Sequence, residues 1–176
     1  MAGIEFEESG MLFAFDGNSA YHIEKSATFA AVAGRMTCEC VVLHRGIVTF
    51  IEAKKSLPRV DNRERFGEFI ADICTKFTDS FAFYCAVHLR RHKGESLPQA
   101  MQSVALQKSQ FEFYLVINGH NVAWLSPIME GLRREMKKML KIWGIRDSSV
   151  KVINEQIALR LGLIKACVAA GAGTHI

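Results

Sequence analysis

The chain has 176 residues, enough for one domain with a substantial core and too few for two such domains to be expected. Hydrophobic residues make up 49% and charged residues 23%, as in an ordinary soluble globular protein, and the net charge of +4 is compatible with a polyanionic partner without identifying one. No uninterrupted apolar run reaches the roughly 18 residues that a membrane helix needs, so we expect none.

Apolar periodicity and turn residues predict the elements of the first half. The pattern indicates a strand at 11–15, a helix at 19–33, strands at 36–44 and 47–54, and a long helix from about 61 to 91. Ser19 is expected to cap the first helix and Asp61 the long one, with Glu64 as its return partner. Arg45 and Gly46 are expected to form a two-residue hairpin turn.

The second half is expected to alternate helices and strands. The pattern indicates a short helix at 97–108, a strand at 111–117, a helix at 126–143, a strand at 150–153, a helix at 154–163 and a flexible tail at 169–176. Ser126 and Pro127 have the order of a cap followed by proline at the first helical position. Residues 1–168 should therefore form one α/β domain, with a mixed central sheet flanked by helices.

The hairpin at 36–54 carries charged residues inside a strongly apolar pattern. If Arg45 and Gly46 form the turn, paired positions sum to 91 and Glu39 lies opposite Glu52. Lys54 is two residues beyond Glu52 and shares its face of the sheet. Two carboxylates at about 5 Å repel each other, and either a lysine or a divalent metal ion relieves this repulsion.

This residue set is the one that metal-assisted phosphodiester hydrolysis needs. Mg²⁺ prefers one or two carboxylates together with water and phosphate oxygens, and it lowers the pKa of bound water. A lysine beside the ion can orient the attacking water and stabilise developing negative charge. The sequence thus predicts a site in which Glu39 and Glu52 bind Mg²⁺ or Mn²⁺ and Lys54 takes part in catalysis.

The pattern resembles the PD-(D/E)xK nuclease superfamily, whose restriction-endonuclease-like core has the order αβββαβ. In that resemblance, Glu39 stands for the first acid and Glu52-Ala53-Lys54 for the (D/E)-x-K triad. Glu24 matches the glutamate that many members carry on the preceding helix and that faces the metal. The segment from Phe50 to Ser56 also looks like a group of small bacterial or phage proteins of this superfamily.

The chain departs from the family pattern in two ways, and other interpretations stay open. The first acid is normally Asp after Pro, whereas here Glu39 follows Cys38, and no glutamine-rich or tyrosine motif follows Lys54. The cluster could instead be a cross-strand salt bridge, or a nuclease core that kept the fold and lost turnover. Glu24 would also be favourable in a first helical turn whatever its function.

Basic residues in two places are candidates for contact with nucleic-acid phosphates. Those just beyond the triad are Lys55, Arg59, Arg63 and Arg65, and a stripe on the 126–143 helix includes Arg133 and Lys137. Phosphate contact would make binding sensitive to salt. The alternative is that both groups are solvated faces of the protein.

Other motifs give no competing chemistry. His88 and His92 are four residues apart, but no Cys or carboxylate at suitable spacing supports a zinc site. The two cysteines that flank Glu39 lack a second pair and are expected to point to the opposite face. No Gly-rich phosphate loop or nucleophile elbow occurs.

The combined expectation is a metal-dependent nuclease that acts on nucleic acid, with DNA as the favoured substrate and no membrane partner. The N-terminus lacks the layout of a signal peptide, so we expect the cytoplasm. A homodimer would suit the cutting of both strands, although nothing in the sequence marks an interface. The alternatives are a catalytically inactive nuclease-fold module that binds nucleic acid or a protein, and a structural subunit of a larger assembly.

Overall fold

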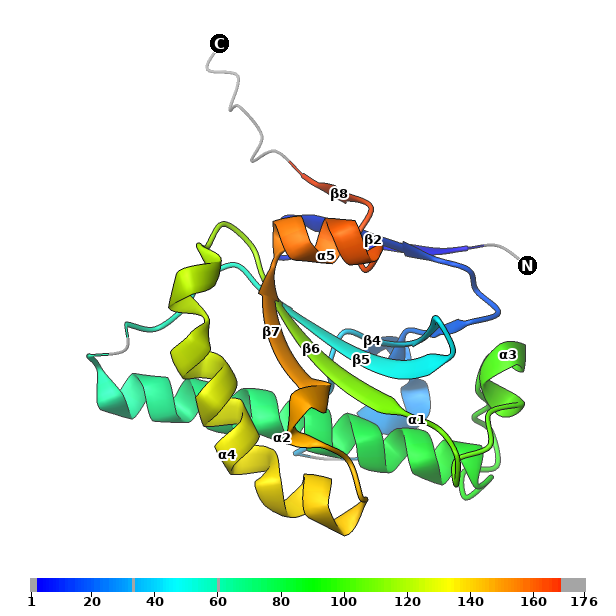
Figure 1. The fold of residues 1–176 in the computed structure, drawn as a ribbon. Coiled ribbons are helices and arrows are strands. Elements are labelled where there is room, and N and C mark those ends of the chain that lie inside the picture. The colour runs from blue at the N-terminus through cyan, green and yellow to red at the C-terminus, as the bar shows by residue number, and fades with distance from the viewer. Residues whose placement is uncertain (1–2, 33, 60, 169–176) are drawn as a thin grey trace.

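A five-stranded mixed sheet forms the centre of the computed structural model, which describes residues 3–32, 34–59 and 61–168 (Figure 1). The elements are β1 (Ile4–Glu8), β2 (Met11–Phe15), β3 (Ala20–Tyr21), η1 (Ile23–Lys25), α1 (Ala27–Ala30), β4 (Cys40–His44), β5 (Ile47–Lys54), α2 (Arg63–His88), α3 (Gln99–Gln102), β6 (Phe111–Ile117), η2 (Val122–Trp124), α4 (Ser126–Ile142), η3 (Asp147–Ser149), β7 (Val150–Asn154), α5 (Glu155–Leu161) and β8 (Ala166–Cys167). The central sheet has the order β3-β4-β5-β6-β7, and a smaller antiparallel sheet has the order β1-β2-β8. The predicted mixed sheet packed against helices is confirmed.

The predicted hairpin joins β4 and β5. Arg45 and Gly46 have φ angles of 51° and 78°, the left-handed values that such a two-residue turn requires. The antiparallel ladder extends as far as the pair Cys40–Ile51, so the predicted register is confirmed over β4. β5 then pairs in parallel with β6, and β6 with β7. Both faces of β5 and β6 are covered, which explains their nearly continuous apolar sequences.

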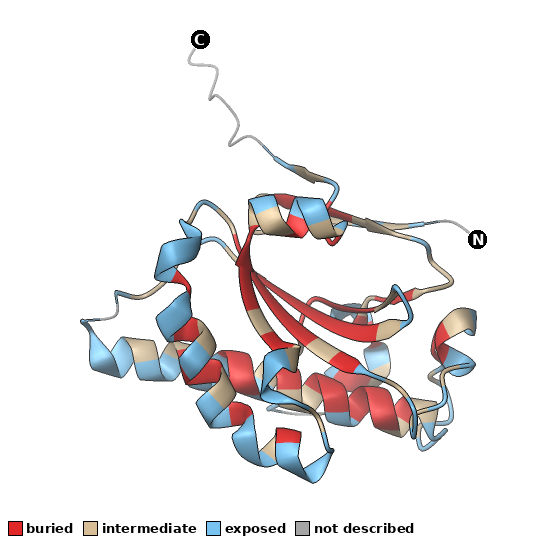
Figure 2. Ribbon diagram, viewed as in Figure 1, coloured by how far each residue is buried: buried red, intermediate tan, exposed pale blue. Residues whose placement is uncertain are grey.

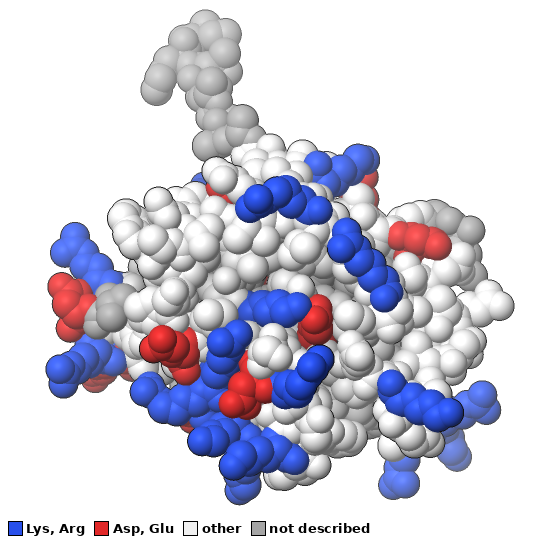
Figure 3. Space-filling model, viewed as in Figure 1, with Lys and Arg blue, Asp and Glu red and all other residues white. Residues whose placement is uncertain are grey.

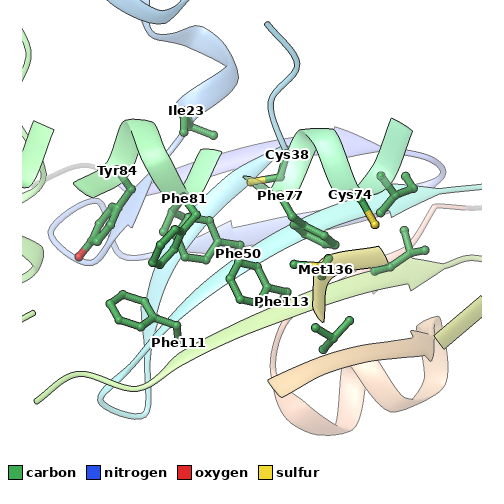
Figure 4. Close-up of a cluster of buried hydrophobic side chains, with 14 of the residues drawn as sticks. Ile23, Cys38, Phe50, Cys74, Phe77, Phe81, Tyr84, Phe111, Phe113 and Met136 are labelled. Carbon is green, nitrogen blue, oxygen red and sulfur yellow. The ribbon is translucent and has the colours of Figure 1, made fainter. Parts of the chain in front are cut away.

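One face of the central sheet packs against α2 and α4 (Figures 1 and 4). Large apolar side chains recur every three or four residues on α2 and turn one stripe toward the sheet, as predicted. The centre of this core is aromatic: the rings of Phe50 and Phe113 stack at 5.1 Å, and Phe77 meets Phe113 edge-on at 5.5 Å. Each such fully buried side chain contributes about 1.5–3 kcal/mol of transfer free energy. Figure 2 shows this buried stripe along α2.

The opposite face of the sheet is covered by the small sheet and by α5. Met11 and Phe13 of β2 are fully buried against β5 and β6 residues such as Ile51 and Val116. Asn154 begins α5, because its side chain accepts a hydrogen bond from the Ile157 N–H. The sheet is therefore buried on both sides. The small sheet is held near the end of β6 by one hydrogen bond. Asn118, which follows β6, donates from its side chain to the carbonyl of Ser9 in the turn between β1 and β2.

The helix predicted at 19–33 is wrong. Ala20 and Tyr21 form β3 and pair with β4, and only the short η1 and α1 follow. Tyr21 and Ile23 are buried in the aromatic core, so the chain follows the sheet edge instead of coiling away from it. Ser26 caps α1 by accepting a hydrogen bond from the Phe29 N–H.

Other boundaries also differ from the predictions. Asn62, not Asp61, caps α2, because its side chain accepts from the Arg65 N–H. The predicted strand at 36–44 begins only at Cys40, and the predicted helix at 97–108 shortens to α3. The strand β1 was not predicted, and the predicted tail at 169–176 lies outside the described residues. Across the part of the chain that the structure describes, no helix is long and apolar enough to cross a membrane.

Candidate active site

Glu52 is a fully buried carboxylate near the end of β5. It lies on the same side of the strand as Phe50, so the pleat directs it toward α2. Its Oε1 lies 2.7 Å from the ammonium nitrogens of both Lys54 and Lys76. Its Oε2 is buried and has no hydrogen-bond partner among the described residues. Because buried polar atoms are almost always paired, this oxygen calls for a partner that the described residues do not supply.

Glu39 lies directly before β4, beside Glu52, and is 5% exposed. Its N–H donates to the Ile51 carbonyl at 2.9 Å, while Cys40 also pairs with Ile51. Two residues of one strand thus face one residue of the other, which is a β-bulge. The directly opposed pair predicted for Glu39 and Glu52 is therefore wrong in register. The two carboxylates still share one cation, because Lys76 Nζ lies 4.0 Å from Glu39 Oε1.

The bulge also redirects Cys38. Both cysteines that flank Glu39 were expected on one face, opposite Glu39, but Cys38 packs in the aromatic core, where its N–H donates to the Ser80 hydroxyl of α2 at 2.9 Å. Cys40 lies on the other face, among residues that contact the small sheet. An extra residue in the strand breaks the strict alternation of side chains, which is why the expectation fails here.

The electrostatics of Glu39 are unusual for a carboxyl group. Its pKa is raised from 4.5 to about 8: burial is the largest cause, the negative charges of Glu52 and Glu8 add to it, and Lys76 opposes them. Glu39 is thus held mostly protonated at neutral pH by its surroundings. A divalent cation between the two carboxylates would favour the ionised form and release this proton.

Lys76 is the site residue that sequence reasoning missed. It lies on α2, and its side chain is only 19% exposed. Burial acts against its charge, but the charges of Glu52 and Glu39 and the side-chain hydrogen bonds of Lys76 together outweigh burial, and the pKa of Lys76 is raised. A signal was present in the sequence, because Lys76 lies three residues after Ile73 and four before Ser80, both buried on the inward stripe. A charged residue on that stripe needs a buried partner.

Lys54 connects the buried carboxylates to the surface. Its side chain is 32% exposed and lines an open hollow of about 410 Å³, whose walls include Leu57, Arg65, Phe69 and Asp72. The hollow lies between the end of β5 and the first turns of α2. A substrate group in the hollow would meet the ammonium group of Lys54 before it reached Glu52.

Glu24 does not join the carboxylate pair. It lies on η1 instead of the predicted helix, its side chain is 58% exposed, and it approaches His22 Nε2 at 3.8 Å. Its charge still raises the pKa of Glu39, but it is the smallest of the causes. A supporting role for Glu24 toward an ion stays a prediction.

The predicted nucleic-acid contacts are exposed with one exception. Lys55, Arg59, Arg63, Arg65 and Lys137 are exposed, whereas Arg133 is half-buried and donates from Nε to the Val150 carbonyl. Figure 3 shows Lys and Arg side chains gathered over one part of the surface, with acidic side chains interspersed. On α2, the acidic residues Glu64, Glu68 and Asp72 are exposed as well, close in sequence to Arg63 and Arg65. The surface is therefore mixed in charge near the site, and phosphate contact by these residues stays a prediction.

The donor set for a metal ion consists of two carboxylates. Within 3–32, 34–59 and 61–168, no three His, Cys, Asp or Glu side chains come together as ready ligands. His88 and His92 line a separate hollow of about 480 Å³ at the far end of α2. Glu39 and Glu52 fit an ion that takes one or two carboxylates and keeps its waters, which is the habit of Mg²⁺.

Comparison with known proteins assigns no family. No family model, curated protein or solved structure matches this chain. The chemistry of the site must therefore be judged from its own side chains.

Proposed function

We propose that this protein is a metal-dependent nuclease that hydrolyses phosphodiester bonds, with DNA as its substrate. The observation that carries the proposal is the buried Glu52 carboxylate, with one oxygen held by two ammonium groups and the other unpartnered. A carboxylate taken out of water needs a compensating charge or bond on each side. A divalent cation at Oε2, shared with Glu39, would supply it.

Glu39 and Glu52 would hold Mg²⁺ or Mn²⁺ in this site. Such an ion lowers the pKa of water and shields the negative charge of a phosphate. Lys54 bridges the buried pair and the open hollow, so its ammonium group can orient the attacking water and stabilise the charge that develops on the phosphate. Lys76 holds Glu52 Oε1 from the α2 side and leaves Oε2 free for the ion.

The order of elements supports a restriction-endonuclease-like core. The hairpin β4–β5, the long helix α2 and the parallel strand β6 follow one another as that fold requires, with the (D/E)-x-K residues at the end of β5. Its first helix would correspond only to the short η1–α1 segment, because the longer predicted helix is missing. The support from the fold is thus strongest around the two carboxylates.

A catalytically inactive module that binds nucleic acid or a protein is the second candidate. One observation favours it: the cluster holds two carboxyl groups and two ammonium groups, and both ammonium groups already lie on Glu52. With Glu39 protonated, the cluster needs no further cation to balance its charge. A site of this kind could be retained for folding alone.

A nuclease assay with plasmid and single-stranded DNA, in Mg²⁺, Mn²⁺ or EDTA, separates the two candidates. Glu52→Gln and Lys54→Met should each lower metal-dependent cutting by about hundredfold or more. The matched controls Glu130→Gln and Lys108→Met alter exposed residues away from the cluster and should cut like the wild type. Cutting that survives EDTA or Glu52→Gln would refute the proposal. A folded wild type that does not cut would favour the inactive module.

A further inference from the structure

A hollow of about 480 Å³ lies where α2 ends, and the proposed function does not use it. Its walls come from the last turn of α2, the loop at 90–96 and the segment that leads into α3. His88, which lines it, lies about 18 Å along the axis of α2 from Lys76. The hollow is therefore separate from the carboxylate pair, and its volume is in the range of pockets that hold small molecules.

Hydrogen bonds between distant segments hold the walls of this hollow in place. The Glu95 carboxylate accepts from the Tyr21 hydroxyl at 2.9 Å and from the Ser26 hydroxyl at 2.8 Å. These two bonds fasten the loop after α2 to the segment between β3 and α1. On the other side, Gln102 of α3 donates from Nε2 to the Leu97 carbonyl at 2.6 Å. The shape of the hollow is thus set by the fold of the chain.

The lining of the hollow is rich in positive charge and hydrogen-bond donors. Arg90 and Lys93 line it with a guanidinium and an ammonium group, and His88 and His92 add imidazole N–H donors. Among the described residues that line it, Glu95 alone is acidic, and both of its oxygens already accept hydrogen bonds. Figure 3 shows Lys and Arg side chains over the end of the molecule where α2 ends below α3 in Figure 1. An anionic group would therefore be favoured in this hollow.

The backbone at Arg90 is strained in a way that points to its side chain. Arg90 has a φ of 57°, and its N–H donates to the Val87 carbonyl at 2.8 Å, so it closes the end of α2. Glycine is the usual residue at such a position, because a Cβ atom makes the left-handed conformation unfavourable. Strain of this kind gathers at binding and catalytic sites. A guanidinium group at this strained position is what an anion site would require.

An unpartnered polar atom in the wall of the hollow is an independent observation. The Nδ1 atom of His88 is buried and has no hydrogen-bond partner among the described residues. Tyr84, one turn earlier on α2, packs beside it with ring centroids 6.1 Å apart, and its buried hydroxyl is unpartnered in the same way. Because buried polar atoms are almost always paired, this end of α2 calls for polar partners that the described residues do not supply.

We propose that this hollow binds a small organic molecule through its phosphate group, with Arg90 and Lys93 as the contacts to the phosphate. A phosphomonoester carries nearly two negative charges and three strong acceptor oxygens, which suits two cations and nearby N–H donors better than a carboxylate does. The planar guanidinium group of Arg90 matches phosphate with two parallel hydrogen bonds. Val87 and Leu97, each 3% exposed, give the hollow an apolar wall for the organic part. This inference does not depend on the proposed nuclease activity.

Isothermal titration calorimetry with phenyl phosphate, in EDTA, tests the inference without any cleavage reaction. Arg90→Gln should weaken binding by about tenfold or more, because it removes charge-assisted hydrogen bonds to the phosphate. Arg90→Gly removes the same side chain and suits the positive φ, so it should weaken binding equally without lowering the unfolding temperature. The matched control is Arg91→Gln, in the same turn but outside the walls of the hollow. It should bind within about twofold of the wild type, although it too removes a cation near the end of α2.

Three results would overturn the inference and leave the proposed function as it stands. The first is a wild type that binds no phenyl phosphate, or that binds benzoate, with the same ring and a carboxylate, as tightly. The second is wild-type binding in both Arg90→Gln and Arg90→Gly. The third is an equal loss of binding in Glu52→Gln, which would place the phosphate at the carboxylate pair instead of the hollow. The expected result is that Glu52→Gln binds phenyl phosphate like the wild type.

Discussion

Replacing Glu39 with glutamine should stabilise the metal-free protein at neutral pH. The carboxyl group has a pKa of about 8 in the folded chain against 4.5 as its ordinary value, because it is buried and because the negative charges of Glu52 and Glu8 oppose its ionisation. Between these two values the folded state binds a proton that the unfolded state has released. The free energy of unfolding therefore falls as pH rises from 4.5 to 8, and below 4.5 the group contributes no such change.

The size of the effect follows from the pKa difference. Each pH unit in this window costs about 1.4 kcal/mol, so the wild type should lose about 3 kcal/mol between pH 4.5 and pH 7 through Glu39. Glutamine has a similar shape and does not ionise. Glu39→Gln should therefore gain about 3 kcal/mol of stability relative to the wild type on going from pH 4.5 to pH 7.

Urea unfolding in EDTA at the two pH values measures this difference. The matched control Glu7→Gln removes an exposed carboxyl on β1. It should change the free energy of unfolding by less than about 0.5 kcal/mol at both pH values. A Glu39→Gln effect that is the same at pH 4.5 and pH 7 would refute the claim that the site holds this carboxyl protonated. An effect of opposite sign would mean that Lys76 outweighs burial and the neighbouring acids.

Two further predictions concern the supports of the site. Lys76→Met should lower the free energy of unfolding by about 2–3 kcal/mol, because it removes one of two ammonium groups from the buried Glu52; a loss below about 0.5 kcal/mol in urea unfolding would show that the remaining lysine suffices. Gly10→Ala should destabilise by more than Gly46→Ala in thermal unfolding, since both glycines have positive φ but only Gly10 would bring a Cβ to 2.9 Å from Asn118. The backbone cost alone is about 1 kcal/mol, and equal losses in the two variants would show that the close contact with Asn118 contributes nothing.

Local sequence patterns were enough to predict the central hairpin and the shared face of Glu52 and Lys54. Arg45-Gly46 allows a two-residue turn, and that turn sets the register of β4 against β5 by counting alone. Glu52 and Lys54 had to share a face because side chains alternate along a strand. The interior apolar stripe of α2 and the strand β6 were likewise predictable, since their periodicities extend over many residues.

Other features depended on contacts between distant segments. A helix was expected where β3 and η1 occur, because the buried positions of Tyr21 and Ile23 arise only from packing at the sheet edge. The bulge at Glu39 depends on how the chain enters β4, with the N–H of Cys38 bound to Ser80 of α2. No local sequence pattern at 36–40 indicates that contact.

The sequence by itself determined that Glu52 and Lys54 share one face of β5 and that Glu39 lies near the open end of the same hairpin, because turn chemistry and strand alternation act over a few residues. Only the tertiary structure decided their surroundings. α2 adds Lys76 from 24 residues beyond Glu52, and the bulge before β4 moves Glu39 out of the register that counting predicts. Burial, and with it the pKa of Glu39 and the unpartnered oxygen of Glu52, exists only once these distant segments have packed together.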